Sequence, residues 1–352
     1  MFMVVFPDID PVLLPADGRF GCGPSKVRPD QLQALFTPLL MGTSHRAAPV
    51  RHVVASFKDG LRSLLSVPEG YEIVLGNGGA SAFWDVACTC LIDSRAAFGS
   101  WGAFGAKFAL EAERAPHLRT PLIDEAEAGS LVTLAPRDAS ESVDAYAYPH
   151  NETSTGVASP VYRVDAYYFS LHKALGSDGG LWVAVLSPAA IERARRIEAA
   201  LQGRWIPQFL SLSAAIDNSR KDQTLNTPAV ATIIMAQRQV AWLNERGGMD
   251  AVAAHCAQAS SLIYDWATAH PALSPFVTEE AWRSPVTATI EINADVKATD
   301  LAAHLRAHEI VDIGAYRGVG ANQLRIGTWP SVEIGDVEAL LECIDYCLEQ
   351  VL

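Results

Sequence analysis

Apolar residues recur along the chain with two periods, that of a helix and that of a short buried strand. Residues 50–65 carry Val54, Phe57 and Leu61 on one side, as an amphipathic helix does. Strand-like runs alternate with helical stretches through the first two thirds of the chain, which predicts an α/β fold with a mostly parallel sheet. The predicted strands are 71–75, 96–100, 143–148, 165–171 and 181–186, and the predicted helices are 50–65, 80–92, 102–115 and 188–201.

The pattern changes near residue 247. A long helix over 229–246 ends at Gly247 and Gly248, and glycine is the residue that most readily closes a helix. Helices and strands then alternate again over about 100 residues, a size typical of an independent domain. The later elements are helices at 248–269, 300–308 and 337–352 and strands at 286–292 and 323–328. We therefore predict an N-terminal arm (1–20), a large domain (21–247) and a smaller C-terminal α/β domain (248–352).

The composition is that of an ordinary soluble globular protein. Of 352 residues, 49% are hydrophobic and 19% are charged. The formal net charge of −13 argues against a nucleic-acid partner, because no basic patch is present to neutralise phosphates. A small anionic ligand is still compatible with this charge, since it needs only local arginines and helix N-termini.

The sequence also argues against a membrane location and a metal site. No apolar run approaches the roughly 18 residues that span a bilayer. The N-terminal segment lacks a positively charged region and carries Asp8 and Asp10, so it does not resemble a signal peptide. No C-x-x-C pair and no zinc-like Cys/His spacing occurs, so we expect free buried thiols in a cytoplasmic protein. The cysteines are Cys22, Cys88, Cys90, Cys256, Cys343 and Cys347.

One lysine occupies an unusual position. Residues 165–180, D-A-Y-Y-F-S-L-H-K-A-L-G-S-D-G-G, bring Lys173 from an apolar strand onto a glycine-rich turn, and a second apolar strand follows. Desolvation favours the neutral amine of such a lysine, which can then act as a nucleophile. This is what a Schiff base with pyridoxal phosphate requires. Taken alone, the motif fits a solvated lysine in a turn better.

A second motif suits an anion. Residues 76–81, G-N-G-G-A-S, lie between a predicted strand and a predicted helix, where glycines allow close approach and helix N–H groups face a ligand. The motif lacks the ending of a Walker A loop and the third glycine of a dinucleotide fingerprint. A tight turn without a ligand is the alternative.

Further polar or aromatic residues follow predicted strands or lie in loops. Trp101 follows a strand, where it suits stacking on a planar ring or ordinary core packing. Asn151, Glu152 and Thr153 follow another strand, at the edge where open α/β sheets bind ligands. Arg325 lies among apolar residues, as an arginine that grips a carboxylate or pairs internally does. The segments G-T-S-H-R (42–46) and N-T-P (226–228) offer further donors, or are plain surface loops.

Together and in this order, these motifs resemble the phosphoserine aminotransferases, a family of class-V, fold-type I pyridoxal phosphate enzymes, and are closest to its actinobacterial branch. The resemblance covers nearly the whole chain, and so many ordered motifs outweigh the plain alternative for each one. The matching segments are F-G-C-G-P-S-K-V (20–27), G-T-S-H-R (42–46), G-N-G-G-A-S-A-F-W (76–84), H-N-E-T-S-T-G (150–156), D-A-Y-Y-F-S-L-H-K (165–173), S-D-G-G-L-W (177–182), N-T-P-A (226–229) and N-Q-L-R (322–325).

The resemblance implies a role for each matching residue. Lys173 would hold pyridoxal 5'-phosphate as an aldimine and later move a proton between the substrate Cα and the cofactor. Trp101 would stack on the pyridine ring, and Thr153 would contact the ring oxygen. The substrate would be bound by Arg325 at its carboxylate and by His45 and Arg46, reaching across a dimer, at its phosphate. The cofactor phosphate would be held by Gly79, Ala80, Ser81 and His172, with Asn226 and Thr227 supplied by the other subunit.

The function implied is that of a homodimeric phosphoserine transaminase with shared active sites. It would transfer the amino group of L-glutamate to 3-phosphohydroxypyruvate in serine biosynthesis, and its use of 4-phosphohydroxythreonine in vitamin B6 synthesis is a further expectation. The alternatives are another class-V enzyme, such as an alanine– or serine–glyoxylate aminotransferase, and a non-catalytic relative.

Two features depart from the family. His172 stands where most members have glutamine, and it can still donate a hydrogen bond to the phosphate.

The second departure concerns an aspartate that keeps the ring nitrogen of the cofactor protonated. The family places it on a strand about two dozen residues before the lysine, whereas Asp165 lies only eight positions before Lys173. Either the protein lacks that strand and is an impaired aminotransferase, or the written sequence omits residues between Val157 and Val164. We favour the omission, because a core strand is difficult to delete and the flanking motifs are intact; a consecutive Cα–Cα distance far above 3.8 Å would identify it.

Overall fold

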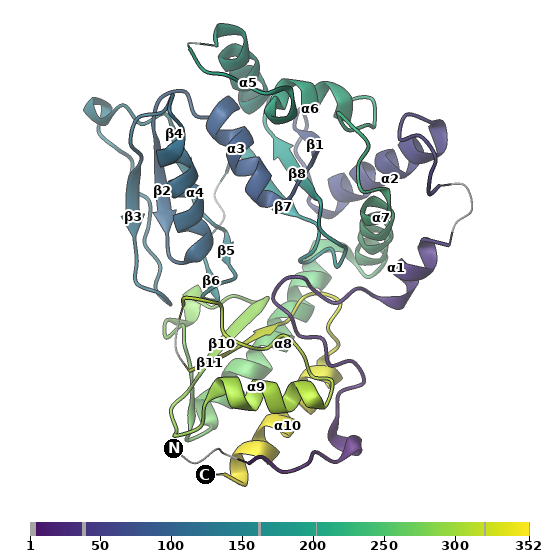
Figure 1. Ribbon diagram of the computed structural model, residues 1–352, viewed down its shortest axis with the longest axis vertical. Helices are drawn as coiled ribbons and strands as arrows, with labels where there is room; N and C mark the ends of the chain where they lie inside the picture. Colours follow the sequence, from purple (N-terminus) through teal and green to yellow (C-terminus); the bar gives the residue numbers. More distant parts are fainter. Residues whose placement is uncertain (1–4, 37–39, 161–162, 202, 320–321, 352) are drawn as a thin grey trace.

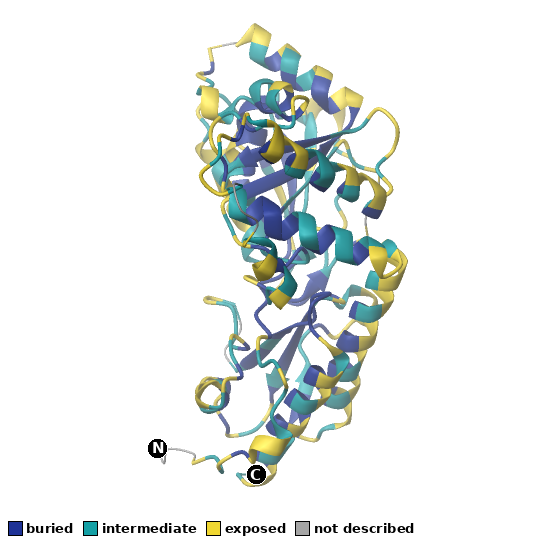
Figure 2. Cartoon of the chain, turned by 90° about the vertical axis from the view of Figure 1, so that its right-hand side faces the viewer, coloured by how far each residue is buried: buried dark blue, intermediate teal, exposed yellow. Residues whose placement is uncertain are grey.

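The computed structural model describes residues 5–36, 40–160, 163–201, 203–319 and 322–351, and all statements below refer to these residues. They form two bodies (Figure 1). The larger body contains helices α1 to α7 and strands β1 to β8, and the smaller one contains α8 to α10 and β9 to β11, with both ends of the chain beside it. Buried residues line the interior of both bodies, whereas the outer faces of the helices are exposed (Figure 2).

One sheet of the large body has the strand order β1-β8-β7, formed by β1 (Glu72–Asn77), β8 (Leu181–Leu186) and β7 (Ala166–Ser170). Both pairings are antiparallel, with Val183 opposite Leu75 on one side and Phe169 on the other. Residues 171–180 between β7 and β8 are too few for the helical crossover that parallel neighbours need, so the chain turns back on itself.

The other main sheet is parallel, with the order β3-β2-β4. It is formed by β3 (Leu122–Glu125), β2 (Ala96–Ser100) and β4 (Ala145–Ala147), and a short hairpin of β5 (Asn151–Glu152) and β6 (Val157–Ala158) follows it. All predicted strands of the large body are present within two residues of their expected ends, and the α/β class is confirmed. The interval in which we expect an omission, 157–164, includes residues 161 and 162, which lie outside the described part of the chain.

Helices cover these sheets. α3 packs against β7 and β8 and against α4, α4 packs on β2, and α2 packs against α7. In the first of these clusters Phe83, Phe98 and Phe108 are almost fully buried. In the second, Val54, Phe57 and Leu61 of α2 contribute the apolar face that their spacing predicts. The helices are α1 (Pro29–Ala34), α2 (Ala48–Leu64), α3 (Ala80–Cys90), α4 (Ala103–Arg114), α5 (Pro188–Ala200), α6 (Leu212–Ser219) and α7 (Val230–Glu245).

The small body has its own core. Its antiparallel sheet, β9 (Leu273–Pro275), β10 (Thr287–Ile292) and β11 (Gln323–Gly327), is accompanied by α8 (Gly248–Ala269), α9 (Ala298–Ala307) and α10 (Ile334–Glu349). Two residues from the N-terminal arm, Ile9 and Phe20, lie in this core with exposed fractions of 2% and 0%. The arm therefore packs with the last hundred residues of the chain rather than with its sequence neighbours.

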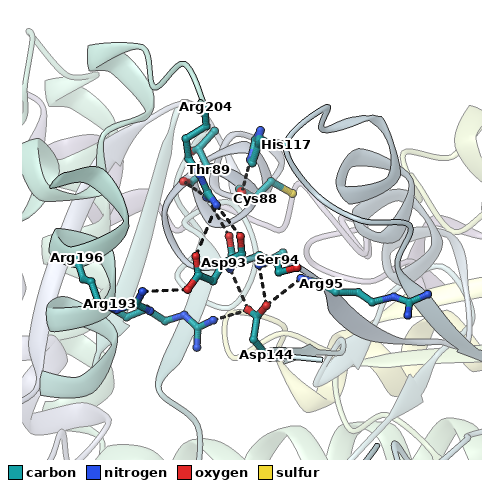
Figure 3. Close-up of polar contacts among 11 residues, drawn as sticks. Cys88, Thr89, Asp93, Ser94, Arg95, His117, Asp144, Arg193, Arg196 and Arg204 are labelled. Carbon is teal, nitrogen blue, oxygen red and sulfur yellow. Dashed lines mark hydrogen bonds and ion pairs between the residues drawn. The ribbon is translucent and has the colours of Figure 1, made fainter. Parts of the chain in front are cut away.

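A polar network joins α3, β4 and α5 at one end of the large body (Figure 3). The carboxylate of Asp144 accepts hydrogen bonds from the backbone N–H groups of Asp93 (2.9 Å), Ser94 (2.7 Å) and Arg95 (2.9 Å) and also pairs with Arg193 of α5. Next to it, the guanidinium of buried Arg204 donates to backbone carbonyls at the end of α3. This network ties the start of β4 to the sheet of β7 and β8 through α5.

Asp144→Ala is expected to lower the free energy of unfolding by about 2–3 kcal/mol, because three backbone donors and one guanidinium lose their acceptor. Urea denaturation measures this change. Asp59→Ala, at an exposed position of α2, is the matched control. Equal midpoints for the two variants would contradict the assigned role of Asp144.

The cysteines, the apolar helices and the potential metal-binding side chains of the described residues bear on three of the sequence expectations. All six cysteines are buried and free, as predicted. Among the described helices, none is long and apolar enough to cross a membrane. The described His, Cys, Asp and Glu residues include no group of three or more placed to hold a metal ion.

Candidate active site

Lys173 lies in the turn directly after β7, half-buried among residues from three distant segments. Its Nζ donates to Thr153 Oγ1 at 2.7 Å and to the carbonyl of Cys22 at 3.4 Å. The ring of Phe104, at the start of α4, lies 5.2 Å from the same nitrogen. A Cβ atom at Gly23, where φ is +142°, would lie 3.1 Å from Lys173 Cε, so glycine is needed there. The contacts with Thr153, Cys22 and Phe104 therefore fix the position of the Lys173 amine.

The pKa of Lys173 is lowered from 10.5 to about 8, mainly by burial and to a smaller extent by the positive charge of Arg325, against the opposing effects of Cys22 and Glu152. An amine with this pKa is half neutral near pH 8. An ordinary lysine at that pH is neutral in only about one molecule in 300. Lys173 is therefore prepared to attack a carbonyl carbon at near-neutral pH.

The pH dependence of this amine can be measured. The rate at which Lys173 captures pyridoxal phosphate should rise with pH through a midpoint near 8, because only the neutral amine reacts. Visible absorbance follows the capture, and a free lysine derivative, with an expected midpoint near 10.5, is the control. A protein midpoint above 10 would contradict the lowered pKa.

The glycine-rich segment after β1 forms the N-terminus of α3, with Gly79 as its N-cap residue. Gly78 N–H donates to the carbonyl of Gly180 at 2.9 Å, which fixes this turn beside the one that carries Lys173. Ala80 N–H donates to Ser170 Oγ at 2.8 Å, and Ser81 is exposed. An anion at this helix end would therefore meet backbone donors and two hydroxyl groups.

Trp101 follows β2 and is 1% exposed, and its indole Nε1 has no hydrogen-bond partner. The loop around it is fixed by Glu152, which is fully buried. The Glu152 carboxylate accepts from the N–H groups of Phe104 (2.9 Å) and Gly105 (3.0 Å), so it caps the N-terminus of α4. Thr155 Oγ1 donates to the carbonyl of Trp101 at 3.1 Å. The indole is thus held in place by residues of the H-N-E-T-S-T-G motif.

Arg325 on β11 connects the two bodies at this site. Its Nη1 donates to the carbonyl of Thr153, the residue whose hydroxyl accepts from Lys173. Its guanidinium lies 5.3 Å from the ring of Tyr316, and its Nε is buried without a partner. Tyr316 in turn accepts a hydrogen bond from Lys107 of α4. Arg325 therefore keeps a free donor close to Lys173, as a carboxylate-binding arginine needs.

A cavity of about 1490 Å³ brings most of the predicted residues together. It is lined by Lys173 and by the predicted cofactor-binding residues Gly79, Ala80, Ser81, Trp101, Thr153 and His172. Burial, with a smaller contribution from Lys173, lowers the pKa of His172, so its imidazole is neutral at pH 7. The cavity also extends away from this group, between β4 and β7 towards α5.

Of the five other predicted residues, Arg325 is absent from the described residues that line the cavity, and the remaining four form a second cluster. His45 is 4% exposed, and its Nδ1 lies 3.2 Å from Thr227 Oγ1. Asn226 Oδ1 accepts from the side chain of Asn77, at the end of β1. Arg46 is exposed and reaches the carbonyl of Leu225. Among the described residues that line the cavity, none of these four predicted residues is present.

The residues of the cavity fit pyridoxal phosphate at three points. A partly neutral amine, a helix N-terminus for the phosphate and a buried indole with an unsatisfied N–H lie around one space. Among the described residues that line the cavity, no carboxylate lies at that end. The carboxylates of the described lining are Asp144 just before β4, Asp165 just before β7 and Glu192 of α5, which lie away from Lys173.

Sequence reasoning missed several residues of this site. Ser170 comes from 90 positions away in the chain to accept from Ala80, and Phe104 and Tyr316 belong to segments without a recognisable motif. Glu152 lies within a recognised motif, and its position directly after a predicted strand was the available signal for a role at this edge of the sheet.

Comparison with known proteins gives consistent results. A family model described as aminotransferase class-V matches residues 132–315. The phosphoserine aminotransferases of Rhodococcus opacus and Rhodococcus jostii are 46% and 45% identical over 378 residues, which covers 99% of this chain and 100% of each relative. The solved phosphoserine aminotransferase of Cytophaga hutchinsonii aligns with a TM-score of 0.84 at 20% identity, over 94% of this chain and 99% of that chain. That of Bacillus circulans subsp. alkalophilus aligns with a TM-score of 0.81 at 20% identity, over 95% and 99%. These two structures confirm the predicted fold type I.

Proposed function

Because this chain belongs to the phosphoserine aminotransferase family of class-V aminotransferases, whose cofactor is pyridoxal 5'-phosphate, we propose that it is a phosphoserine transaminase. It transfers the amino group of L-glutamate to 3-phosphohydroxypyruvate and yields O-phospho-L-serine and 2-oxoglutarate. The observation that carries the proposal is the amine of Lys173, with a pKa of about 8, in one cavity with Trp101 and the N-terminus of α3.

Different residues of this chain have different roles in the reaction. When bound, pyridoxal phosphate supplies an electron sink for the carbanion that forms at the substrate Cα. Lys173 holds the cofactor and then, as a free amine, removes the proton from Cα and delivers it again. Thr153 Oγ1, 2.7 Å from Nζ, orients that amine. Trp101 closes one side of the cavity against water.

Arg325 is proposed to bind the α-carboxylate that glutamate and phosphoserine share. Its unpartnered Nε and its position beside Thr153 support this role. Its contact with the Thr153 carbonyl sets the distance between the carboxylate site and the amine of Lys173. An arginine suits this task because its planar donors match a carboxylate in two parallel hydrogen bonds.

We further propose a homodimer in which His45 and Arg46 bind the substrate phosphate of the opposite active site, and Asn226 and Thr227 contact its cofactor phosphate. Two observations support this. These residues form one cluster outside the cavity of their own subunit, and the nearby side chains of Leu32, Phe36 and Met41 are exposed apolar surface.

The cellular setting follows from the thiols and the reaction. The buried free thiols suit a cytoplasmic protein. We expect the enzyme to act in serine biosynthesis and in the related reaction with 4-phosphohydroxythreonine.

A transamination assay with phosphoserine, alanine and serine as amino donors tests the function. Phosphoserine should be preferred by at least about 100-fold in kcat/KM, because only it places a phosphate on His45 and Arg46. Equal or better activity with alanine or serine and glyoxylate would support another class-V aminotransferase. The absence of a visible band after mixing with pyridoxal phosphate would indicate a non-catalytic relative.

A further inference from the structure

Residues 21–28 connect the two bodies of the protein. They lead from the N-terminal arm, which packs with the small body, to α1 of the large body (Figure 1). At the start of this segment the carbonyl of Gly21 accepts a hydrogen bond from Trp329 Nε1 at 3.1 Å. One residue earlier, the carbonyl of Phe20 accepts from the N–H of Gly327 at 2.7 Å. The segment therefore leaves the small body at the end of β11.

The middle of this segment lies against Lys173 and contacts both its main chain and its side chain. Ser25 N–H donates to the carbonyl of His172 at 2.9 Å, and Ser25 Oγ donates to the carbonyl of Lys173. The carbonyl of Cys22 accepts from Nζ, and Gly23 lies so close that an added Cβ atom would be 3.2 Å from Nζ. Residues 22–25 thus hold the backbone of the lysine and cover its amine.

The next residue, Lys26, attaches the segment to the small body. Its Nζ lies 3.3 Å from Asp336 Oδ2, in the first turn of α10, and 3.2 Å from Asp17 Oδ2 of the N-terminal arm. The side chains of Lys26 and Asp336 are only 9% and 7% exposed. Asp336 Oδ1 also accepts from the backbone N–H of Asp17 at 3.1 Å. One buried ammonium therefore joins the arm, α10 and the segment that contacts Lys173.

The two carboxylates depend on Lys26 to different degrees. Asp17 has a second cation, Arg19, at 2.6 Å, although that arginine side chain is 45% exposed. Among the described residues, Lys26 is the cation that pairs with Asp336. A buried carboxylate that loses its cation is strongly unfavourable, so it recruits water or moves to the surface. Either change loosens the attachment of residues 22–26 to α10.

We propose that Lys26 is a positioning residue for the reacting amine: its ion pair with Asp336 holds residues 22–25 against Lys173, so that the small body fixes the place of the amine in the large body. The inference deepens the proposed function and rests on it for the assignment of Lys173 as the reacting amine. Lys26 acts through the position of residues 22–25 and not through its own charge.

The pKa of Lys173 reports on this link. Burial is the largest cause of its lowering to about 8, and Cys22 and Gly23 supply part of that burial. The titratable groups that act on the amine are Cys22, Arg325 and Glu152. When residues 22–25 move away, water reaches the amine, and the pKa of Lys173 rises towards its ordinary value of 10.5.

The first test measures this pKa without the cofactor. Acetic anhydride acetylates neutral amines, so mass spectrometry of the Lys173 peptide over a series of pH values gives the midpoint. Lys26→Met and Asp336→Ala should each raise the midpoint by at least about 0.5 pH units, although they remove charges of opposite sign. Lys26→Arg, which can still pair with Asp336, should restore it. Shifts of opposite direction in the first two variants would overturn the proposal, because they would indicate a direct effect of charge.

Lys58→Met is the matched control for a general loss of stability. Lys58 pairs with Asp222 at 2.8 Å in the large body, with side chains 16% and 30% exposed, and it does not contact residues 21–26. This variant should lower the urea midpoint, as Lys26→Met does, but leave the labelling midpoint of Lys173 unchanged. An unchanged midpoint in Lys26→Met, or an equal shift in Lys58→Met, would contradict a positioning role.

The second test is kinetic and separates positioning from substrate binding. Lys26→Met should lower kcat of the transamination at least about 5-fold, because a displaced amine reaches the substrate Cα less often. KM for glutamate should change by less than about 2-fold, since Arg325 keeps its contact with Thr153. A raised KM with an unchanged kcat would contradict the proposal. Lack of transamination in the unmodified protein would refute the proposed function instead, and the labelling midpoints would still decide the role of Lys26.

Discussion

Replacing Lys173 by alanine is expected to reduce transaminase activity by at least about 1,000-fold. The substitution removes the amine that holds the cofactor and the base that moves the proton at Cα, and general acid–base catalysis alone contributes about 100- to 10,000-fold. Thr153 Oγ1 and the carbonyl of Cys22, which the amine contacts, are not bases that can replace it. Steady-state kinetics with glutamate and 3-phosphohydroxypyruvate measures the loss, and absorbance measures the loss of the bound cofactor band.

The control for this prediction is Lys297→Ala, an exposed lysine before α9, which should leave both readings unchanged. Lys173→Arg adds a sharper comparison. It keeps a positive charge near Thr153 but offers no neutral amine, because the arginine pKa is above 12. If Lys173→Arg or Lys173→Ala kept more than a tenth of the activity, Lys173 would not be the catalytic amine.

Arg325→Ala is expected to reduce kcat/KM for glutamate by about 100- to 1,000-fold. The loss corresponds to about 3–4 kcal/mol, which is the usual cost of removing one partner from a buried charged pair. The buried Nε of Arg325 has no hydrogen-bond partner within the described protein, so it is available to a substrate carboxylate. The variant removes this donor, and the bound carboxylate then loses its partner. The effect should appear for phosphoserine as well, because both donors carry the same α-carboxylate.

Two further variants separate carboxylate binding from a general loss of structure. Arg325→Lys keeps the charge but loses the planar pair of donors, and it should recover only part of the activity. Arg306→Ala removes an exposed arginine of the same body, paired with Asp312, and should have no effect on kcat/KM. A loss in Arg325→Ala that is matched by a large fall in its urea midpoint would indicate that Arg325 acts by supporting the fold through Thr153.

Elements with long or continuous apolar patterns could be predicted from the sequence closely. The strand at 96–100 and the helix at 248–269 have the predicted bounds, because uninterrupted burial or several helical turns give a strong periodic signal. The helices α1 and α6 were not predicted, since six or eight residues span too few turns to show a period. Pattern alone also cannot tell which strands become neighbours, so the division of the large body's strands between the sheets β1-β8-β7 and β3-β2-β4 was not predicted.

For the active site, the sequence pointed to residues within contiguous motifs. Lys173, Trp101 and Thr153, which line the cavity, could be proposed from the sequence because each lies beside a strand end in a recognisable segment. Ser170 and Tyr316 were not found, because each acts through contacts with distant segments: Ser170 with the N-terminus of α3, and Tyr316 with Lys107 and Arg325. Contacts of this kind depend on tertiary packing, which a single sequence does not encode in any local pattern.

The position of the N-terminal arm has a consequence for synthesis on the ribosome. Ile9 and Phe20 leave the ribosome long before the α8, β10 and α10 residues of the core in which they are buried. At about 5–20 residues per second, these two apolar side chains wait for tens of seconds without their partners. During that time the large body can fold, while the arm stays an unfolded apolar segment. Nascent chains of this protein are therefore expected to depend on chaperones that hold the segment around Ile9 and Phe20 until α10 has been made.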